Sequence, residues 1–204
     1  MRFLCLVLLI LTLSFAVHAD PYSGGRNSFS KVFYLSFAGK GGMGKGGTYD
    51  GEAMETRDLY VFGGEATLGF FVSGIMIGAS AEYNLWKQKS EPGDVDGLNI
   101  SGKQTTFSPV IGIPLGPMLF QIKYPVSSKY KMDNESTDGK SIEYSDAKIP
   151  FSLMLAYSLG KTFIGIEYTK IEYKNLALDG EETTVDRDNR LALSSFVLVY
   201  GYKF

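Results

Sequence analysis

Strict alternation of apolar and other side chains is the feature that most constrains the fold of this 204-residue chain. A period of two recurs along eight stretches, whereas a helical period near 3.6 is hard to find. Successive side chains of an extended strand point to opposite faces, so the pattern predicts a β-sheet with one apolar face. The expected strands lie near residues 32–38, 59–70, 75–86, 106–113, 118–124, 148–157, 164–169 and 195–204.

The expected connections alternate between short and long. Short turns are expected at 72–74, 114–117 and 158–161, and long loops at 39–58, 87–103, 127–146 and 171–190. Loops of that length are unusual in a compact soluble domain. Tight turns at one end and long loops at the other, over an even number of strands, are typical of barrels that span a bacterial outer membrane.

The two faces of the expected strands differ in the direction that a membrane barrel requires. One face is almost wholly apolar, and the other carries Glu65, Glu82, Lys123, Lys148 and Glu167. A soluble barrel would place its polar side chains outside and its apolar ones inside. We therefore predict an all-β fold, an eight-stranded antiparallel up-and-down transmembrane β-barrel over residues 29–204, with these five charged side chains as a buried network in the lumen. A soluble barrel or sandwich remains the alternative.

Aromatic residues gather toward both ends of the expected strands, where girdles meet the two membrane–water boundaries. The two expected groups are Tyr60, Phe62, Tyr83, Trp86, Tyr124 and Tyr168 at one end, and Phe70, Phe71, Tyr157, Tyr202 and Phe204 at the other.

The first nineteen residues have the pattern of a secretory signal peptide. Arg2 precedes an apolar run over residues 3–17, and the small residues Val17 and Ala19 flank His18. The run is shorter than the roughly 18–20 residues that a spanning helix needs, which disfavours a membrane anchor. We expect cleavage after Ala19, with residues 20–28 as a short periplasmic lead-in. Cleavage would remove the one cysteine and the one histidine of the chain.

The last strand ends on alternating aromatic residues, Tyr200, Tyr202 and the terminal Phe204. With this ending, the chain resembles the small eight-stranded outer-membrane barrels of the OmpA-barrel, OmpX and OmpW kind. In those families such an ending is a signal for the barrel-insertion machinery. The resemblance implies a monomer in the outer membrane of a Gram-negative bacterium, in contact with membrane lipid and lipopolysaccharide. No functional residue of those families is assigned to a position in this chain.

Two motifs suggest ligands but are incomplete. Residues 39–48 fit the phosphate-binding pattern G-x-x-x-x-G-K, but Gly46 stands where a Ser or Thr should hold Mg²⁺. We interpret this segment as a flexible glycine-rich surface loop. The acidic pairs at 94–96 and 186–188 lack the rest of a calcium loop. No cofactor or metal is therefore expected, and 20 basic against 22 acidic residues give no footprint for nucleic acid.

The expected function follows from what the mature chain contains. Residues 20–204 include no histidine, the side chain that supplies a base near neutral pH. A site built from carboxylates alone, Glu65, Glu82 and Glu167, stays open as a lesser alternative. We predict a protein that is not an enzyme and has a structural or surface-interaction role, through its four extracellular loops and an unidentified surface ligand. The alternative is a narrow channel or conduit for small or apolar molecules.

Overall fold

The computed structural model describes residues 33–50, 53–89, 99–135, 140–185 and 190–204. The expected signal peptide (1–19) and lead-in (20–28) lie outside these residues, as do the acidic pairs at 94–96 and 186–188. No helix in the described ranges has the length and apolar character needed to cross a membrane.

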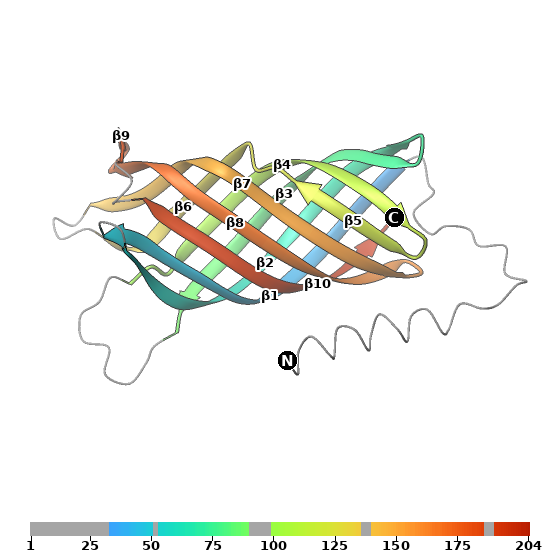
Figure 1. Ribbon diagram of the computed structural model, residues 1–204, viewed down its shortest axis with the longest axis horizontal. Coiled ribbons are helices and arrows are strands. Elements are labelled where there is room, and N and C mark those ends of the chain that lie inside the picture. The colour runs from blue at the N-terminus through green and yellow to red at the C-terminus, as the bar shows by residue number, and fades with distance from the viewer. Residues whose placement is uncertain (1–32, 51–52, 90–98, 136–139, 186–189) are drawn as a thin grey trace, which may run out of the picture.

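The described residues form one antiparallel sheet that closes on itself (Figure 1). The strands are β1 (Phe33–Asp50), β2 (Ala53–Val72), β3 (Ile75–Gln88), β4 (Gly102–Leu115), β5 (Met118–Lys123), β6 (Ser127–Glu135), β7 (Ser141–Leu159), β8 (Thr162–Leu178), β9 (Glu181–Thr184) and β10 (Leu191–Lys203). Strands that follow one another in the chain pair from β1 to β4 and from β7 to β9. β5 and β6 both pair with β4 and β7, and β10 pairs with β8 and with β1, which closes the ring.

The ring consists of eight strand positions, which we call its members, although the described residues contain ten separate strands. β5 and β6 are successive parts of one member, because both pair with β4 on one side and with β7 on the other. They are separated at Pro125, which has no backbone N–H to donate to a ladder. β9 extends the ring as a hairpin on β8. The predicted eight-stranded antiparallel up-and-down barrel is thereby confirmed.

The three short turns lie where the sequence predicts them. They join β2 to β3 at Ser73–Gly74, β4 to β5 at Gly116–Pro117, and β7 to β8 at Gly160–Lys161. The φ angles of Gly74, Gly116 and Gly160 are 83°, 64° and 74°, in the left-handed region that glycine adopts without a steric penalty. These turns and the C-terminus lie at the same end of the barrel (Figure 1).

Three of the four expected long loops, 39–58, 127–146 and 171–190, are mostly strand, which corrects their predicted bounds. Of the described residues in 87–103, only those at the two ends belong to β3 and β4. β1 and β2 remain paired up to Asp50 and Ala53, so most of 39–58 belongs to a hairpin. β6 and the start of β7 occupy much of 127–146, and β8 and β9 occupy much of 171–190. A tilted strand crosses a bilayer with about 9–11 residues, whereas β2 has 20 and β7 has 19. The surplus length extends the barrel at the end opposite the short turns.

The glycine-rich segment at 39–48 is part of β1 and neither a flexible loop nor a phosphate-binding turn. It pairs with both β2 and β10 along its length. Its lumen-facing glycines make room for large side chains from other strands. A Cβ on Gly44 would lie 2.7 Å from Cζ3 of Trp86 and 2.7 Å from the carbonyl oxygen of Ser194.

We expect Gly44→Val to lower the free energy of unfolding by about 1–3 kcal/mol, because the added side chain overpacks the lumen. Gly39→Val is the matched control, since a Cβ at Gly39 meets nothing within 4 Å. Urea unfolding in lipid vesicles, followed by tryptophan fluorescence, measures both. Equal costs for the two variants would contradict this packing.

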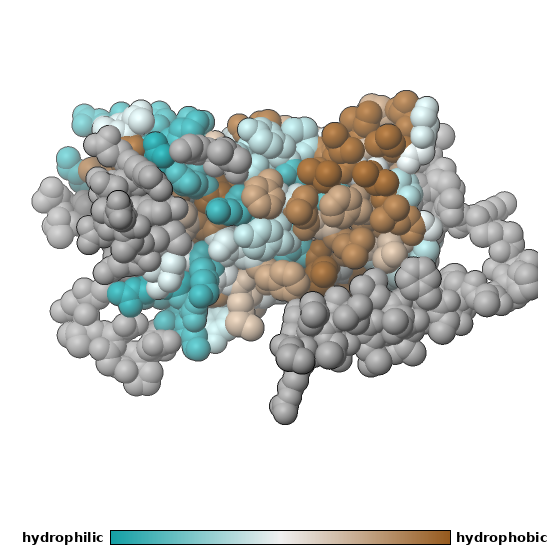
Figure 2. Space-filling view, in the orientation of Figure 1, coloured by the Kyte–Doolittle hydropathy of each residue, from teal (hydrophilic) through white to brown (hydrophobic). Residues whose placement is uncertain are grey.

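The outer face of the barrel is apolar over the half that includes the short turns. Figure 2 shows a brown hydrophobic belt toward that end and teal hydrophilic residues toward the other. Exposed large apolar side chains come from every member of the ring; among them are Phe37, Phe62, Leu68, Ile77, Phe107, Ile111, Ile122, Leu153, Ile164, Leu198 and Tyr200. The predicted inward and outward alternation holds on these strands.

Two of the expected girdle aromatics lie inside the barrel instead. Trp86 is 1% exposed and belongs to the core of the lumen. Phe71 packs against the buried cluster nearest the short turns. Phe71 on β2 and Trp86 on β3 both occupy inward positions in the alternation of their strands. Whether an aromatic side chain faces the lumen or the membrane is therefore set by this alternation and not by how close the residue lies to the end of the strand.

We expect Leu198→Arg, in the middle of the β10 stretch of the belt, to cost about 2–4 kcal/mol of unfolding free energy in vesicles. Thr105→Arg is the control, because Thr105 is exposed on β4 beyond the belt residue Phe107. Its cost should be about 0–1 kcal/mol. A larger loss of unfolding free energy in Thr105→Arg than in Leu198→Arg would mean that the hydrophobic belt does not lie where the structure has it.

Candidate functional site

Two glutamates on neighbouring strands face each other across the ladder in the lumen. Glu65 on β2 pairs directly with Glu82 on β3, and both side chains point inward. Glu167 on β8 joins them, and oxygen atoms of the three carboxylates lie within 4.8 Å of one another. Like charges directly opposite on a sheet destabilise it. Buried carboxylates in this arrangement therefore need cations between them.

Two lysine side chains supply the cations. Nζ of Lys123, on β5, lies 2.5 Å from Oε2 of Glu65, 3.3 Å from Oε1 of Glu82 and 2.7 Å from Oε2 of Glu167. Nζ of Lys40, on β1, lies 2.5 Å from Oε2 of Glu65, 2.8 Å from Oε2 of Glu82 and 2.9 Å from Oε1 of Glu167. Each ammonium group thus contacts all three carboxylates.

This set of contacts matches the donors to the acceptors. An ammonium group has three N–H donors, one for each glutamate. The hydroxyl of Thr67 donates to Oε1 of Glu65 at 2.7 Å, and Thr169 contacts Oε1 of Glu167 at 3.2 Å. All five charged side chains are at most 6% exposed. We call Lys40, Glu65, Glu82, Lys123 and Glu167 the lumen cluster.

Four of the five residues expected in the lumen network lie in the lumen cluster. The fifth, Lys148, has its backbone on β7 opposite Glu172 of β8, and its side chain lies outside the described part of the chain. Sequence reasoning missed Lys40, because the glycines around it were interpreted as a loop. The parity of Phe33, Leu35 and Phe37 continues through this segment and places Lys40 inward, which is the signal that identifies it.

A second layer, made of hydrogen-bonded polar and aromatic side chains, fills the lumen on the side of the strand extensions. Oε1 of Gln104 accepts from Nε1 of Trp86 at 3.1 Å, and its Nε2 donates to the hydroxyl of Tyr173 at 2.9 Å. Ser128 contacts the same Tyr173 hydroxyl at 2.8 Å. Tyr130 packs between the Trp86 and Tyr173 rings, at centroid distances of 6.5 and 6.3 Å.

An apolar layer fills the lumen on the side of the short turns. Tyr34, Met76, Val110 and Leu119 are buried there, and Phe71 packs against them. The lumen cluster therefore lies between two packed layers. An eight-stranded barrel has an interior just wide enough for side chains, and these three layers occupy it.

The lumen cluster is a poor place for a metal ion. Three carboxylates within 4.8 Å resemble the oxygen donors that Ca²⁺ or Mg²⁺ takes. The ammonium groups of Lys40 and Lys123 already occupy the positions between those oxygens. A divalent cation would have to displace both lysines into a closed lumen.

The strand extensions carry polar contacts on the outer surface. Lys129 pairs with Glu143 at 3.1 Å, and Arg190 pairs with Glu172 at 3.2 Å. In the β8–β9 hairpin, Glu182 accepts hydrogen bonds from Ser145 and Asn175. These bonds hold the pKa of Glu182 below its ordinary value. The surface here is a continuation of the sheet and is ordered by side-chain bonds.

The distribution of charge in this barrel is inverted relative to a soluble protein. Lysine and glutamate side chains are buried in the lumen, while Phe, Leu and Ile side chains cover the outside. A large exposed apolar band needs an apolar solvent, and a closed ring leaves no unpaired backbone groups in it. The architecture is that of a small outer-membrane β-barrel.

The residues expected to guide membrane insertion lie on the outer face of β10 and at its end. Tyr200 is 62% exposed and Phe204 57% exposed. The rings of Tyr202 and Phe204 pack edge to face at 4.8 Å, and Phe37 packs against Phe204 at 5.9 Å. Recognition of this strand by the insertion machinery stays a prediction.

Comparison with solved structures finds likenesses to membrane barrels at low sequence identity. The attachment invasion locus protein Ail of Yersinia pestis, solved with the heparin analogue sucrose octasulfate, is 13% identical. The match covers 84% of this chain and 99% of Ail, with a TM-score of 0.48. Neisserial surface protein A is 7% identical over 85% of this chain and 98% of its own, with a TM-score of 0.46.

A third solved structure, an outer membrane channel from Pseudomonas putida F1, is 10% identical over 89% of this chain and 98% of the channel, with a TM-score of 0.37. No protein-family model matches the sequence. No curated protein matches it either.

We expect Lys123→Met to lower the free energy of unfolding by about 3–5 kcal/mol, because it leaves three buried carboxylates with Lys40 as their one remaining ammonium partner in the lumen cluster. Lys103→Met is the control, since Lys103 is exposed on β4 and should change stability by about 0.5 kcal/mol or less. Denaturant unfolding in vesicles measures both. A cost at Lys123 no larger than that at Lys103 would mean that the lumen cluster does not hold the barrel together.

Proposed function

We propose that this protein is a closed barrel of the outer membrane of a Gram-negative bacterium, with a structural or surface-interaction role. In this proposal it acts through the strand extensions and their connections, and it is neither a channel nor an enzyme. The observation that carries the proposal is the lumen cluster, which crosses the interior from β1, β2 and β3 to β5 and β8.

The lumen cluster favours a closed barrel for an energetic reason. A path for ions past it requires separating ammonium groups from carboxylates that lie 2.5–3.3 Å away. Breaking a buried pair costs several kcal/mol, because each charge is left without water or a partner. The packed layers above and below add to the barrier, since Trp86 and Leu119 are at most 1% exposed. These contacts disfavour the conduit alternative.

The same contacts argue against a carboxylate-only enzyme site. Glycoside chemistry would need two of the glutamates on either side of a sugar, with a water within reach. Glu65, Glu82 and Glu167 instead hold the same two ammonium groups, in a space closed to solvent. With no histidine in residues 20–204, the chain also lacks an unperturbed base near neutral pH.

The extension of the barrel is the part suited to a surface role. β1, β2, β7 and β8 have 17 to 20 residues each, well beyond the length that crosses a bilayer. A ligand of this surface would meet a paired sheet, which loses little conformational entropy on binding. In this way the strand extensions take the place of the long loops expected from the sequence.

We expect the protein, isolated from membranes of cells that express the full chain, to show no discrete conductance steps in a planar bilayer. The physical reason is the closed lumen described above. A heat-dependent shift in gel mobility shows in the same preparation that the barrel is folded. Reproducible steps that change in Lys40→Gln or Glu82→Gln would favour the conduit instead.

Removing residues 46–57, the end of the β1–β2 hairpin, is the complementary experiment. The proposal predicts that this deletion abolishes the surface interaction, measured as binding of the expressing cells to host-cell or matrix layers, while the barrel still folds. Loss of the interaction with Lys123→Gln but not with the deletion would contradict the proposal.

A further inference from the structure

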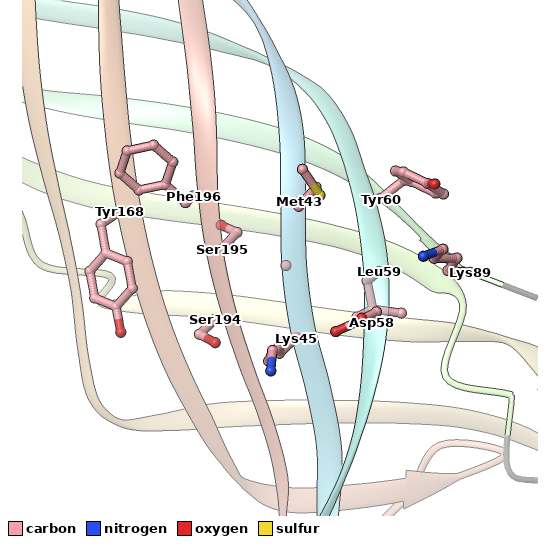
Figure 3. Close-up of a pocket in the computed structure, with 11 residues that line it drawn as sticks. Met43, Lys45, Asp58, Leu59, Tyr60, Lys89, Tyr168, Ser194, Ser195 and Phe196 are labelled. Carbon is pink, nitrogen blue, oxygen red and sulfur yellow. The ribbon is translucent and has the colours of Figure 1, made fainter. Parts of the chain in front are cut away.

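A depression of about 420 Å³ lies on the outer wall of the barrel, over β1 and between β2 and β10. Its floor is the paired backbone of β1 and β10 at Gly44 and Ser195, two positions whose side-chain direction is toward the lumen. Figure 3 shows Met43, Tyr60 and Phe196 around one end of the depression and Lys45 and Asp58 toward the other.

The two ends of the depression differ in chemistry. Met43 is 71% exposed and lies between the rings of Tyr60 on β2 and Phe196 on β10, which are its direct ladder partners. Tyr168 of β8 adds a further aromatic wall. Two residues along β1, Lys45 has Asp58 and Ser194 as its ladder partners, and Lys89 lines the same end.

The depression lies at the edge of the hydrophobic belt that faces the strand extensions. On β10 the outward residues change from Leu198 and Phe196 to Ser194, and on β2 from Phe62 and Tyr60 to Asp58. In a barrel with its short turns in the periplasm, this edge lies at the headgroups of the outer leaflet. A molecule in the depression would therefore have its apolar part in the hydrocarbon and its polar part among headgroups.

The lysines of the depression differ from several others at the same edge. Lys87 pairs with Asp133 at 3.7 Å, and Lys129 pairs with Glu143 at 3.1 Å. In the part of the chain that the structure describes, neither Lys45 nor Lys89 has such an ion pair. Two ammonium groups and one carboxylate, Asp58, leave the depression with an excess of positive charge that favours an anionic ligand.

We propose that this depression binds one lipid of the outer leaflet that has a phosphorylated sugar headgroup. Its acyl chain lies along Met43 between the aromatic walls, and its phosphate lies between Lys45 and Lys89. The carboxylate of Asp58 accepts hydrogen bonds from sugar hydroxyls, and the hydroxyl of Ser194 donates to them. This role explains why an acidic group lies beside the two cations. The inference rests on the proposed membrane location, and it adds a defined binding site and the part of the lipid that each residue contacts.

The test measures lipid binding to the detergent-solubilised protein, purified from membranes of cells that express the full chain, by native mass spectrometry. The probes are lipid A with both phosphates, lipid A without phosphates, and phosphatidylglycerol. The variants are Lys45→Gln/Lys89→Gln, which removes the two cations, and Lys103→Gln as the matched control. Lys103 is exposed just beyond the belt on β4 and does not line the depression.

We expect lipid A with both phosphates to bind more tightly than either other probe. The double variant should lower its affinity roughly tenfold or more, and Lys103→Gln should leave it unchanged. A third variant, Ser194→Trp, fills the depression without changing its charge and should lower the affinity of both lipid A forms. The heat-dependent gel shift confirms that each variant is folded.

Three results would overturn the inference. Equal binding of phosphatidylglycerol would mean that the site recognises any anionic lipid, and equal binding of the dephosphorylated probe would mean that it recognises acyl chains alone. Equal affinity in the double variant would place the lipid elsewhere. None of these results bears on the closed lumen, so failure here is distinguishable from failure of the proposed function, which conductance and the hairpin deletion test.

Discussion

The contact of two buried ammonium groups with three buried carboxylates is the interaction on which the rest of this barrel depends. The outer face has to be apolar, so charged residues on the spanning strands can point only inward. An eight-stranded ring leaves an interior with room for side chains and little water. Charges placed there must satisfy one another, and here each ammonium group contacts every carboxylate. This arrangement ties β1, β2, β3, β5 and β8 together across the lumen.

Much of the fold could be predicted from local pattern, because strand parity is a strong signal when one face contacts lipid. The alternation places Glu65, Glu82, Lys123 and Glu167 inward and Leu198 and Tyr200 outward, as the structure has them. The three short turns could also be predicted, since a glycine lies in each of them. In the structure these glycines have positive φ. A shift of one residue would have reversed every assignment, so agreement on all strands constrains the register.

The packing of the glycine-rich part of β1 could not be predicted from local pattern, because it depends on which strands meet across the lumen. The glycines of β1 lack side chains of their own, so their segment has no visible alternation. Their role appears only when Trp86 from β3 is seen in the space beside Gly44. Lys40 is a different case, because the parity of Phe33, Leu35 and Phe37 places it inward once the glycine-rich segment is taken as a strand. Beyond the belt, the outward side chains become polar while the lumen keeps apolar ones such as Leu59, Ile171 and Leu193. The apolar outer face that marks the spanning strands is lost there, so the extensions resemble loops in sequence although they remain paired.

The filled lumen is tested most directly by its accessibility to a water-soluble thiol reagent. Ser80 lies on β3, two residues from Glu82, and is 1% exposed. In a background with Cys5→Ser, the closed lumen predicts that Ser80→Cys is unreactive from either side of the folded barrel and reacts after unfolding, while Lys103→Cys reacts at once. Rapid modification of Ser80→Cys in the folded barrel would contradict a filled lumen and the central role of the ion pairs.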